Sequence, residues 1–343
     1  MIGAVLMENC WPSHLPNCPG KQGEQVQKGS RLCLSLLAIF VLFWLTACEV
    51  SPAPLPTKIS LVPTLTPSPS VTPLLPTAPI TPTKRPTSEP TPTPEPTPCN
   101  RSGHVAAETF SSATAGPVGY RIYLPPCYGV DGRTYPTLYM LPGNSHTESI
   151  WDELGLDEAA EAAILAGLLP PLIIVMADGG WIANNTSGGP GSYETVILAE
   201  LIPFIENNYC VWAEADGRAL GGLSRGGYWA LEIAFRHPEQ FVSVGGHSAA
   251  LYDIAAGPAF NPEYTGINND LGDLRIYFDI GAEDYLIAPI RRLHQAMETA
   301  GIAHTWVLNS GQHENAYWSA HVGDYLAWYT IPWSFERDSY PLC

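Results

Sequence analysis

Short apolar runs alternate with segments of helical spacing between Thr137 and Tyr329, and this alternation constrains the fold more than any other feature. Runs such as Leu172–Ala177 contain no polar residue, which is typical of strands buried on both faces of a parallel sheet. The intervening segments, such as Pro289–Ala300, have the length and composition of helices. We therefore expect an α/β fold with a mostly parallel central sheet and helices on both faces.

The first 48 residues have the features of an export signal. Lys28 and Arg31 precede Leu32–Leu45, an apolar run of 14 residues, which is shorter than the ~20 residues that a membrane-spanning helix needs. The following Leu45-Thr46-Ala47-Cys48 is similar to a bacterial lipobox, in which the cysteine is acylated. We expect residues 1–47 to be a lipoprotein signal peptide and Cys48 to be lipidated on the outer face of the bacterial membrane. An ordinary signal peptide and a short membrane anchor remain alternatives, and each of them also exports the chain.

Residues 48–98 are dominated by proline and threonine after the cysteine. Such a segment cannot bury a core, and its many prolines lack the N–H donors that a helix or a sheet needs, so we expect an extended, disordered linker. Residues 99–343 then form one folded domain. From Arg101 onward the chain has ten arginines and 28 acidic residues, a net charge of −18. This charge argues against nucleic acid or an anionic membrane surface as a partner, and it favours a neutral or cationic substrate.

Four cysteines remain in the expected domain, and an even number in an oxidising compartment indicates two disulfides. Three pairings are possible. The segments 105–110 and 119–124 have the pattern of an antiparallel hairpin, which would bring Cys99 close to Cys127. The pair Cys210 and Cys343 follows by elimination. None of the four has the spacing of a metal site, and we expect neither a metal nor a cofactor.

The pentapeptide Gly222-Leu223-Ser224-Arg225-Gly226 lies between an apolar run and a helical segment. A G-x-S-x-G sequence in this context is the pattern of a nucleophile elbow, where a serine occupies a sharp strand-to-helix turn. The flanking glycines fit, because a Cβ atom would clash where strand and helix nearly touch. The sequence therefore predicts Ser224 as a nucleophile. A glycine-rich loop with an incidental serine is the alternative.

A serine nucleophile needs a base within hydrogen-bond reach and a third group that orients the base. In chain order the acid is expected after the serine and the histidine after the acid. His313 follows the last expected strand, 304–308, and is the predicted base. Asp284 follows the strand before it and is the predicted acid, although it could instead cap the next helix. Glu283 and Asp279 remain alternatives for the acid.

The oxygen anion that forms during acyl transfer requires preorganised N–H donors. The backbone amide of Arg225, directly after the nucleophile, is one candidate. The amide of Asn144 is the other, because this residue follows Pro142-Gly143 at the end of an expected strand. A plain Pro-Gly turn is the alternative reading of this second loop.

Five aromatic residues lie on or near the same loops and are candidates for substrate binding, since aromatic rings can stack on a phenolic acyl group or a sugar. Core packing is the alternative, and we expect it for about half of them. The glycine-rich segment 184–191 could form one rim of the cleft. The five candidates are Trp181, Tyr193, Tyr228, Tyr252 and Trp318.

From about Gly119 to Tyr329 the sequence resembles the putative-esterase family of α/β hydrolases. This family includes feruloyl esterases, esterase D-like enzymes, enterochelin esterase-like proteins and mycolyltransferase antigens. The resemblance implies the α/β-hydrolase fold, with Ser224, Asp284 and His313 as the triad and Asn144 and Arg225 as oxyanion donors. Many members have His-Gly where this chain has Pro142-Gly143, which removes a polar wall of the pocket. The matching motifs are Tyr135-Pro136, Pro142-Gly143-Asn144 with Trp151, 175–179, 222–227, 281–284, and Gly311-Gln312-His313 with Trp318.

These features together predict a serine carboxylesterase that acts through an acyl-enzyme on an external ester of feruloyl, acetyl or other acyl-saccharide type. An acyltransferase with the same triad is one alternative. A non-catalytic, lipid-anchored binding protein on a hydrolase scaffold is the other. The expected partners are the ester substrate and, through the lipid alone, the membrane.

Overall fold

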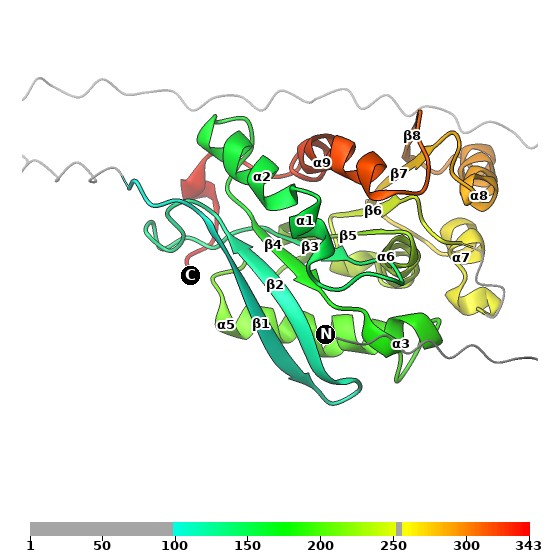
Figure 1. Cartoon of the computed structure of the whole chain (residues 1–343), viewed down its shortest axis with the longest axis horizontal. Helices are drawn as coiled ribbons and strands as arrows, with labels where there is room; N and C mark the ends of the chain where they lie inside the picture. The colour runs from blue at the N-terminus through cyan, green and yellow to red at the C-terminus, as the bar shows by residue number, and fades with distance from the viewer. Residues whose placement is uncertain (1–98, 252–255) are drawn as a thin grey trace, which may run out of the picture. The chain divides into compact units, whose positions relative to one another are not determined.

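The computed structural model describes residues 99–251 and 256–343. The expected signal peptide, Cys48 and the linker 48–98 lie outside these residues, as does Tyr252. The strands form one eight-stranded sheet in the order β1-β2-β4-β3-β5-β6-β7-β8 (Figure 1). They are β1 His104–Ser112, β2 Gly116–Leu124, β3 Thr137–Leu141, β4 Ile173–Ala177, β5 Arg218–Leu223, β6 Ser243–His247, β7 Arg275–Gly281 and β8 Thr305–Asn309.

The sheet is antiparallel only on one side. β1 pairs with β2 as a hairpin, and β2 pairs antiparallel with β4. All other neighbouring strands are parallel. The expected fold class, a mostly parallel sheet with an N-terminal antiparallel hairpin, is confirmed. Because β3 to β8 run in one direction, the loops that follow them meet at one edge of the sheet.

Helices cover both faces of the sheet. The longest are α6, α8 and α9, and no helix in the described part of the chain is long and apolar enough to cross a membrane. The α-helices are α1 Ile150–Glu153, α2 Leu156–Leu165, α3 Gly180–Asn185, α4 Tyr193–Thr195, α5 Ile202–Asn208, α6 Arg225–Arg236, α7 Pro262–Asn268, α8 Ile287–Ala300 and α9 Asn315–Tyr329.

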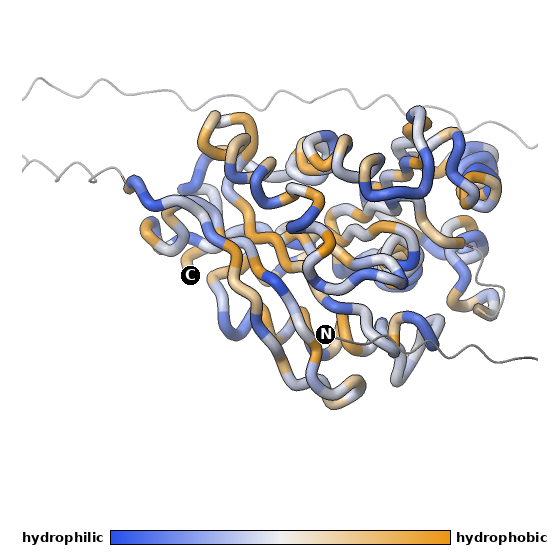
Figure 2. Tube along the Cα trace, viewed as in Figure 1, coloured by the Kyte–Doolittle hydropathy of each residue, from blue (hydrophilic) through white to orange (hydrophobic). Residues whose placement is uncertain are grey.

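Alternate residues of β3, β4, β5 and β7 enter two separate hydrophobic cores. In β3, Leu138 and Met140 pack with residues of α1, α2 and α9, such as Trp151. Tyr139 belongs to the opposite core, with residues of α5, α6 and α8 such as Phe235. Figure 2 shows the hydrophobic residues gathered on these strands between the two helix layers. Both faces of these strands are therefore buried, which explains why β4, Ile173–Ala177, contains no polar residue.

One helical segment is irregular. It begins as a π-helical stretch, Val196–Leu201, and continues as α5. Pro203 occupies the first turn of α5 and has no N–H group to donate, so the regular α-helical hydrogen bonds cannot pass through it.

Two disulfides join distant parts of the described chain. Cys99 bonds to Cys127, which fastens the start of the domain beside the β1–β2 hairpin. Cys210 bonds to Cys343 across a sequence separation of 133 residues. These are the two pairs expected from the sequence. The second disulfide ties the C-terminal segment to the entry of β5, and Cys343 N–H also donates to the Gly132 carbonyl at 2.9 Å.

Candidate active site

Ser224 occupies a sharp turn between β5 and α6. Its backbone has φ 54° and ψ −116°, a conformation that non-glycine residues rarely adopt. The surrounding contacts hold it there, because Ser224 N–H donates to the His247 carbonyl at 2.9 Å and its own carbonyl accepts from Ala250 N–H at 2.8 Å. The geometry is that of a nucleophile elbow.

The two glycines of the elbow are required by close packing. A Cβ atom on Gly222 would lie 2.4 Å from the backbone of Gly226. One on Gly226 would lie 2.3 Å from the Leu141 carbonyl oxygen at the end of β3. Real Cβ atoms essentially never make such contacts, so the strand, the turn and the neighbouring loop can approach this closely only with glycine at both positions.

The structure brings Ser224, His313 and Asp284 together. His313 Nε2 lies 2.9 Å from Ser224 Oγ, and His313 Nδ1 lies 2.9 Å from Asp284 Oδ2. With the proton on Nδ1, the imidazole donates to the carboxylate and accepts from the serine hydroxyl, as a general base must. Asp284 is only 2 % exposed, and its second oxygen accepts from Leu286 N–H at 2.8 Å. The backbone just before α8 therefore holds the carboxylate in place.

The two alternative acids make other contacts. Asp279 is fully buried within β7 and accepts hydrogen bonds from Tyr317 and Tyr325. Its other oxygen lies 2.7 Å from His247 Nδ1. Glu283 accepts from Gly311 N–H at 2.7 Å and so anchors the loop that carries His313. Of the three acids considered, Asp284 is thus the one that contacts the base.

The loop after β3 lies against the elbow. Leu141 pairs with Gly222 in the sheet, and the Leu141 and Pro142 carbonyls pack on the first turn of α6. The Gly143 carbonyl accepts from His146 N–H at 3.1 Å, which closes a turn around Asn144. The two residues predicted to supply oxyanion donors, Asn144 and Arg225, are therefore carried by neighbouring segments.

The aromatic candidates divide into buried and exposed residues. Tyr193, Tyr228 and Trp318 are buried, with 0–2 % of their surface exposed, so they pack within the domain. Trp318 still borders the site, because its ring meets that of His313 edge to face at 4.9 Å. Trp181 on α3 is 74 % exposed and is the candidate that a substrate could reach.

Sequence reasoning missed two residues beside the base. Tyr285 follows the acid directly; it is 69 % exposed and its ring lies 4.9 Å from that of His313. His146 is half-buried and packs edge to face with Trp318 at 6.3 Å. Burial and the nearby His313 lower the pKa of His146, which favours its neutral form. An aromatic residue next to the predicted acid was the one available signal for Tyr285.

One group of carboxylates in the described part of the chain has the spacing of possible metal ligands. Among the described residues, Asp152, Asp157 and Glu158 place carboxylate oxygens within 4.8 Å of one another near the start of α2. The Arg121 guanidinium forms an ion pair with Asp152. This group contains none of the candidate triad residues.

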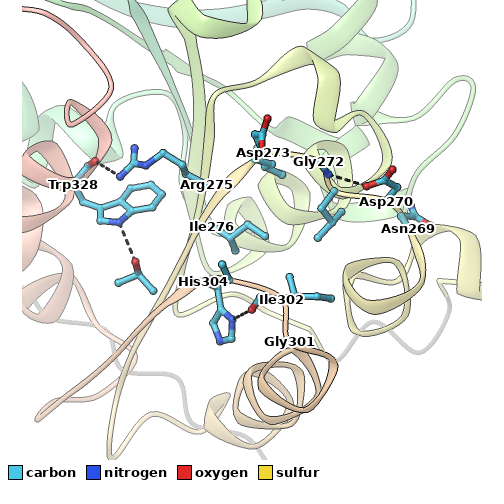
Figure 3. A pocket seen from close by; sticks show the side chains of 14 residues that line it. Asn269, Asp270, Gly272, Asp273, Arg275, Ile276, Gly301, Ile302, His304 and Trp328 are labelled. Atoms are coloured by element: carbon cyan, nitrogen blue, oxygen red, sulfur yellow. Dashed lines mark hydrogen bonds between the residues drawn. The ribbon is translucent and has the colours of Figure 1, made fainter. Parts of the chain in front are cut away.

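A cavity of about 660 Å³ lies at the amino ends of β7 and β8, which is the edge of the sheet opposite the triad. Figure 3 shows Arg275 reaching the carbonyl of Trp328 and His304 turned toward the carbonyl of Ile302. None of the candidate triad residues lines this cavity, so it cannot hold the reacting ester.

The sequence of the chain is similar to that of known esterases. The sequence profile of the putative esterase family matches residues 111–329. An esterase of Mycobacterium tuberculosis is 39% identical over 145 residues, which cover 40% of this chain and 30% of that protein. An endo-1,4-beta-xylanase/feruloyl esterase of Xylanibacter ruminicola is 33% identical over 173 residues, 47% of this chain and 22% of that protein. The chain thus spans less than a third of the length of either relative.

Among solved structures, a ferulic acid esterase superposes with a TM-score of 0.61 at 25% identity, covering 68% of this chain and all of that one. The feruloyl esterase module of Clostridium thermocellum, solved with sinapinate, superposes with a TM-score of 0.57 at 21% identity. The matched region covers 69% of this chain and 92% of the chain of that module. The second comparison supports the fold alone.

Proposed function

Since the chain belongs to the putative esterase family, we propose that it is a serine carboxylesterase with Ser224 as nucleophile, His313 as general base and Asp284 as the acid that orients the base. The observation that carries this proposal is the continuous contact from Asp284 through His313 to Ser224, with 2.9 Å at each step. The strained backbone of the serine supports the same assignment, because such strain clusters at functional sites.

The geometry supports a two-step reaction through an acyl-enzyme. His313 Nε2 takes the hydroxyl proton as Ser224 Oγ bonds to the ester carbonyl carbon. The carbonyl oxygen becomes an anion that the amides of Asn144 and Arg225 stabilise. His313 then gives the proton to the leaving alkoxide, the C–O bond breaks, and the acyl group remains on the serine. Water repeats the sequence, with His313 as base, and releases the acid and the free serine.

We propose an ester with an aromatic or saccharide group as the substrate class. Tyr285 presents an exposed ring beside His313, and Trp181 presents one on α3, the helix that contacts Asn144 and Arg225. Both rings can stack on a phenolic acyl group or a sugar. The domain's net charge of −18 from Arg101 onward favours a neutral substrate over a polyanion. The names of the relatives, which include feruloyl esterases, are compatible with this class.

We further propose that the domain works outside the cell, tethered through Cys48 and the linker that follows it. The lipobox-like sequence and the disulfide-bonded cysteines of the domain support this location. Metabolic labelling with palmitate should mark the wild-type protein and leave Cys48→Ala unmarked. Label that persists in the variant would exclude Cys48 as the acylated residue.

The experiment that tests the function is an ester panel with the full-length protein. Hydrolysis of p-nitrophenyl acetate or butyrate is expected, and Ser224→Ala should abolish it. Feruloylated and acetylated saccharides added to the same panel would identify the acyl and alcohol groups preferred. Undiminished turnover in Ser224→Ala would exclude the serine assignment. Absence of turnover on every ester would favour a binding protein on a hydrolase scaffold.

A further inference from the structure

Helix α3 lies between the two segments that carry the expected oxyanion donors. On one side, the Asn184 side-chain amide donates to the Asn144 carbonyl at 2.8 Å. On the other, the carbonyl of the preceding residue, Ala183, accepts from Arg225 Nε at 2.9 Å. Two consecutive residues of α3 therefore connect Asn144 to Arg225. This connection, which we call the α3 bridge, consists of Asn144, Asn184, Ala183 and Arg225.

Several contacts fix Ala183 and Arg225, the two residues at one end of the α3 bridge. Ala183 is 5 % exposed, and its carbonyl also accepts from Trp229 Nε1 at 2.9 Å. The Arg225 guanidinium lies over the Tyr228 ring at 4.4 Å and donates to the Thr186 carbonyl. Helix α6, which begins at the nucleophile, thus anchors the end of α3 directly.

The other side depends on far fewer contacts. Asn144 and its neighbour Ser145 are exposed, so packing does little to fix their backbone. The turn bond from His146 N–H to the Gly143 carbonyl holds the peptide before Asn144. The Asn184 amide holds the carbonyl after it. These two bonds limit rotation on both sides of Asn144 and so fix the direction of its N–H group.

An oxyanion hole works only when both donors already lie 2.7–3.1 Å from the position of the anion, roughly, before the reaction begins. The two donors expected here belong to segments that are about 80 residues apart in sequence, and each could shift relative to the other. We infer that Asn184 is a positioning residue of the oxyanion hole, which sets the Asn144 amide relative to the Arg225 amide through the α3 bridge. This inference rests on the proposed function, because it assumes that these two amides are the donors.

The substitution Asn184→Ala removes the bond to Asn144 and leaves the triad unchanged. We expect kcat to fall about 10-fold, less than the 10²–10³-fold loss that deletion of a whole donor causes. KM should stay the same, and the loss should be equal for every ester, because all esters form the same oxygen anion. Asn184→Asp keeps the size but replaces the donor by an acceptor, so it should lose at least as much.

The adjacent residue provides a matched control. Asn185 is also an exposed asparagine of α3, but its side-chain amide donates to the Trp181 carbonyl at 2.7 Å within the same helix. Asn185→Ala should therefore retain wild-type kcat. The affinity for a trifluoromethyl ketone, whose adduct with serine carries the oxyanion, should fall about 10-fold in Asn184→Ala and remain unchanged in Asn185→Ala. Equal melting temperatures of the two variants would show that the loss is not one of stability.

Two outcomes would overturn the inference. Equal kcat and inhibitor affinity in the Asn184 and Asn185 variants would show that the α3 bridge does not position the donor. A rise in KM, or a fall in activity that is confined to particular esters, would show that Asn184 contacts the substrate instead. Ser224→Ala is measured in the same assay. Activity that survives in Ser224→Ala would exclude the proposed function. If Ser224→Ala is inactive but Asn184→Ala keeps wild-type activity, only the inference about Asn184 is excluded.

Discussion

Replacing Glu232 by glutamine should make the domain more stable at neutral and alkaline pH. Glu232 lies on the inner side of α6, its side chain has no exposed surface, and its Oε2 has no hydrogen-bond partner among the described residues. Its other oxygen accepts from Arg236 at 3.2 Å. The charge of that arginine is shared with Glu194, to which it also donates. A carboxylate in this position is therefore poorly compensated.

Burial, followed by the negative charge of Glu194, raises the pKa of Glu232 to about 9 from 4.5. The folded protein then keeps a proton that the unfolded chain releases, so the free energy of unfolding decreases as pH rises through this interval. The slope is about 1.4 kcal/mol per pH unit for one proton, which amounts to about 3 kcal/mol between pH 6 and pH 8. Glutamine has nearly the same shape and does not titrate, so Glu232→Gln should remove this part of the slope.

Urea unfolding followed by tryptophan fluorescence at pH 6, 7 and 8, with the disulfides intact, measures the difference. Wild type should lose more stability over this range than Glu232→Gln, and the variant should be the more stable protein at pH 8. Glu239→Gln is a suitable control, because the Glu239 side chain is 65% exposed. Parallel slopes for wild type and Glu232→Gln would show that Glu232 is already ionised in the folded protein, and the reasoning from burial would be wrong.

Three further substitutions test other parts of the structure. Gly226→Ala places a Cβ atom 2.3 Å from the Leu141 carbonyl oxygen, and the resulting shift of the elbow should reduce ester hydrolysis by about 100-fold or more; near-normal rates would refute the packing argument. Cys343→Ser removes the disulfide to Cys210, which spans 133 residues. It should lower the free energy of unfolding by about 2–5 kcal/mol, measured by urea titration. An unchanged urea midpoint would contradict this stabilising role. Trp181→Ala should raise KM several-fold for feruloyl or saccharide esters and leave KM for an aliphatic ester without a ring, such as ethyl acetate, unchanged. An equal rise in KM for both kinds of ester would argue against stacking.

Much of the fold follows from local sequence. The strands are buried on both faces, so their apolar character is visible without knowledge of the partners, and the boundaries differ from expectation by only a few residues. The G-x-S-x-G motif predicts Ser224, and positions after later strands predict Asp284 and His313. In the structure His313 contacts both Ser224 and Asp284. Chain order and strand ends carry this information, because parallel strands bring their following loops to one edge.

Side-chain contacts between elements could not be predicted in the same way. Tyr193 and Tyr228 lie near the site in sequence, but the rotation of their helices turns both rings into the core. The bond from Asn184 to Asn144 joins residues 40 positions apart, and no local pattern marks it. The sequence likewise leaves Glu232 as an ordinary helix residue, since its burial depends on how α6 packs.

Covalent labelling can identify the nucleophile itself, which we propose to be Ser224. A fluorophosphonate phosphonylates an activated serine with loss of fluoride, and the modified peptide can be identified by mass spectrometry. Full-length protein should lose esterase activity as one phosphonyl group appears on the peptide that contains Ser224. Labelling should be absent in Ser224→Ala and much slower in His313→Ala. Inactivation with the label on another residue, or equal labelling of Ser224→Ala, would show that Ser224 is not the nucleophile.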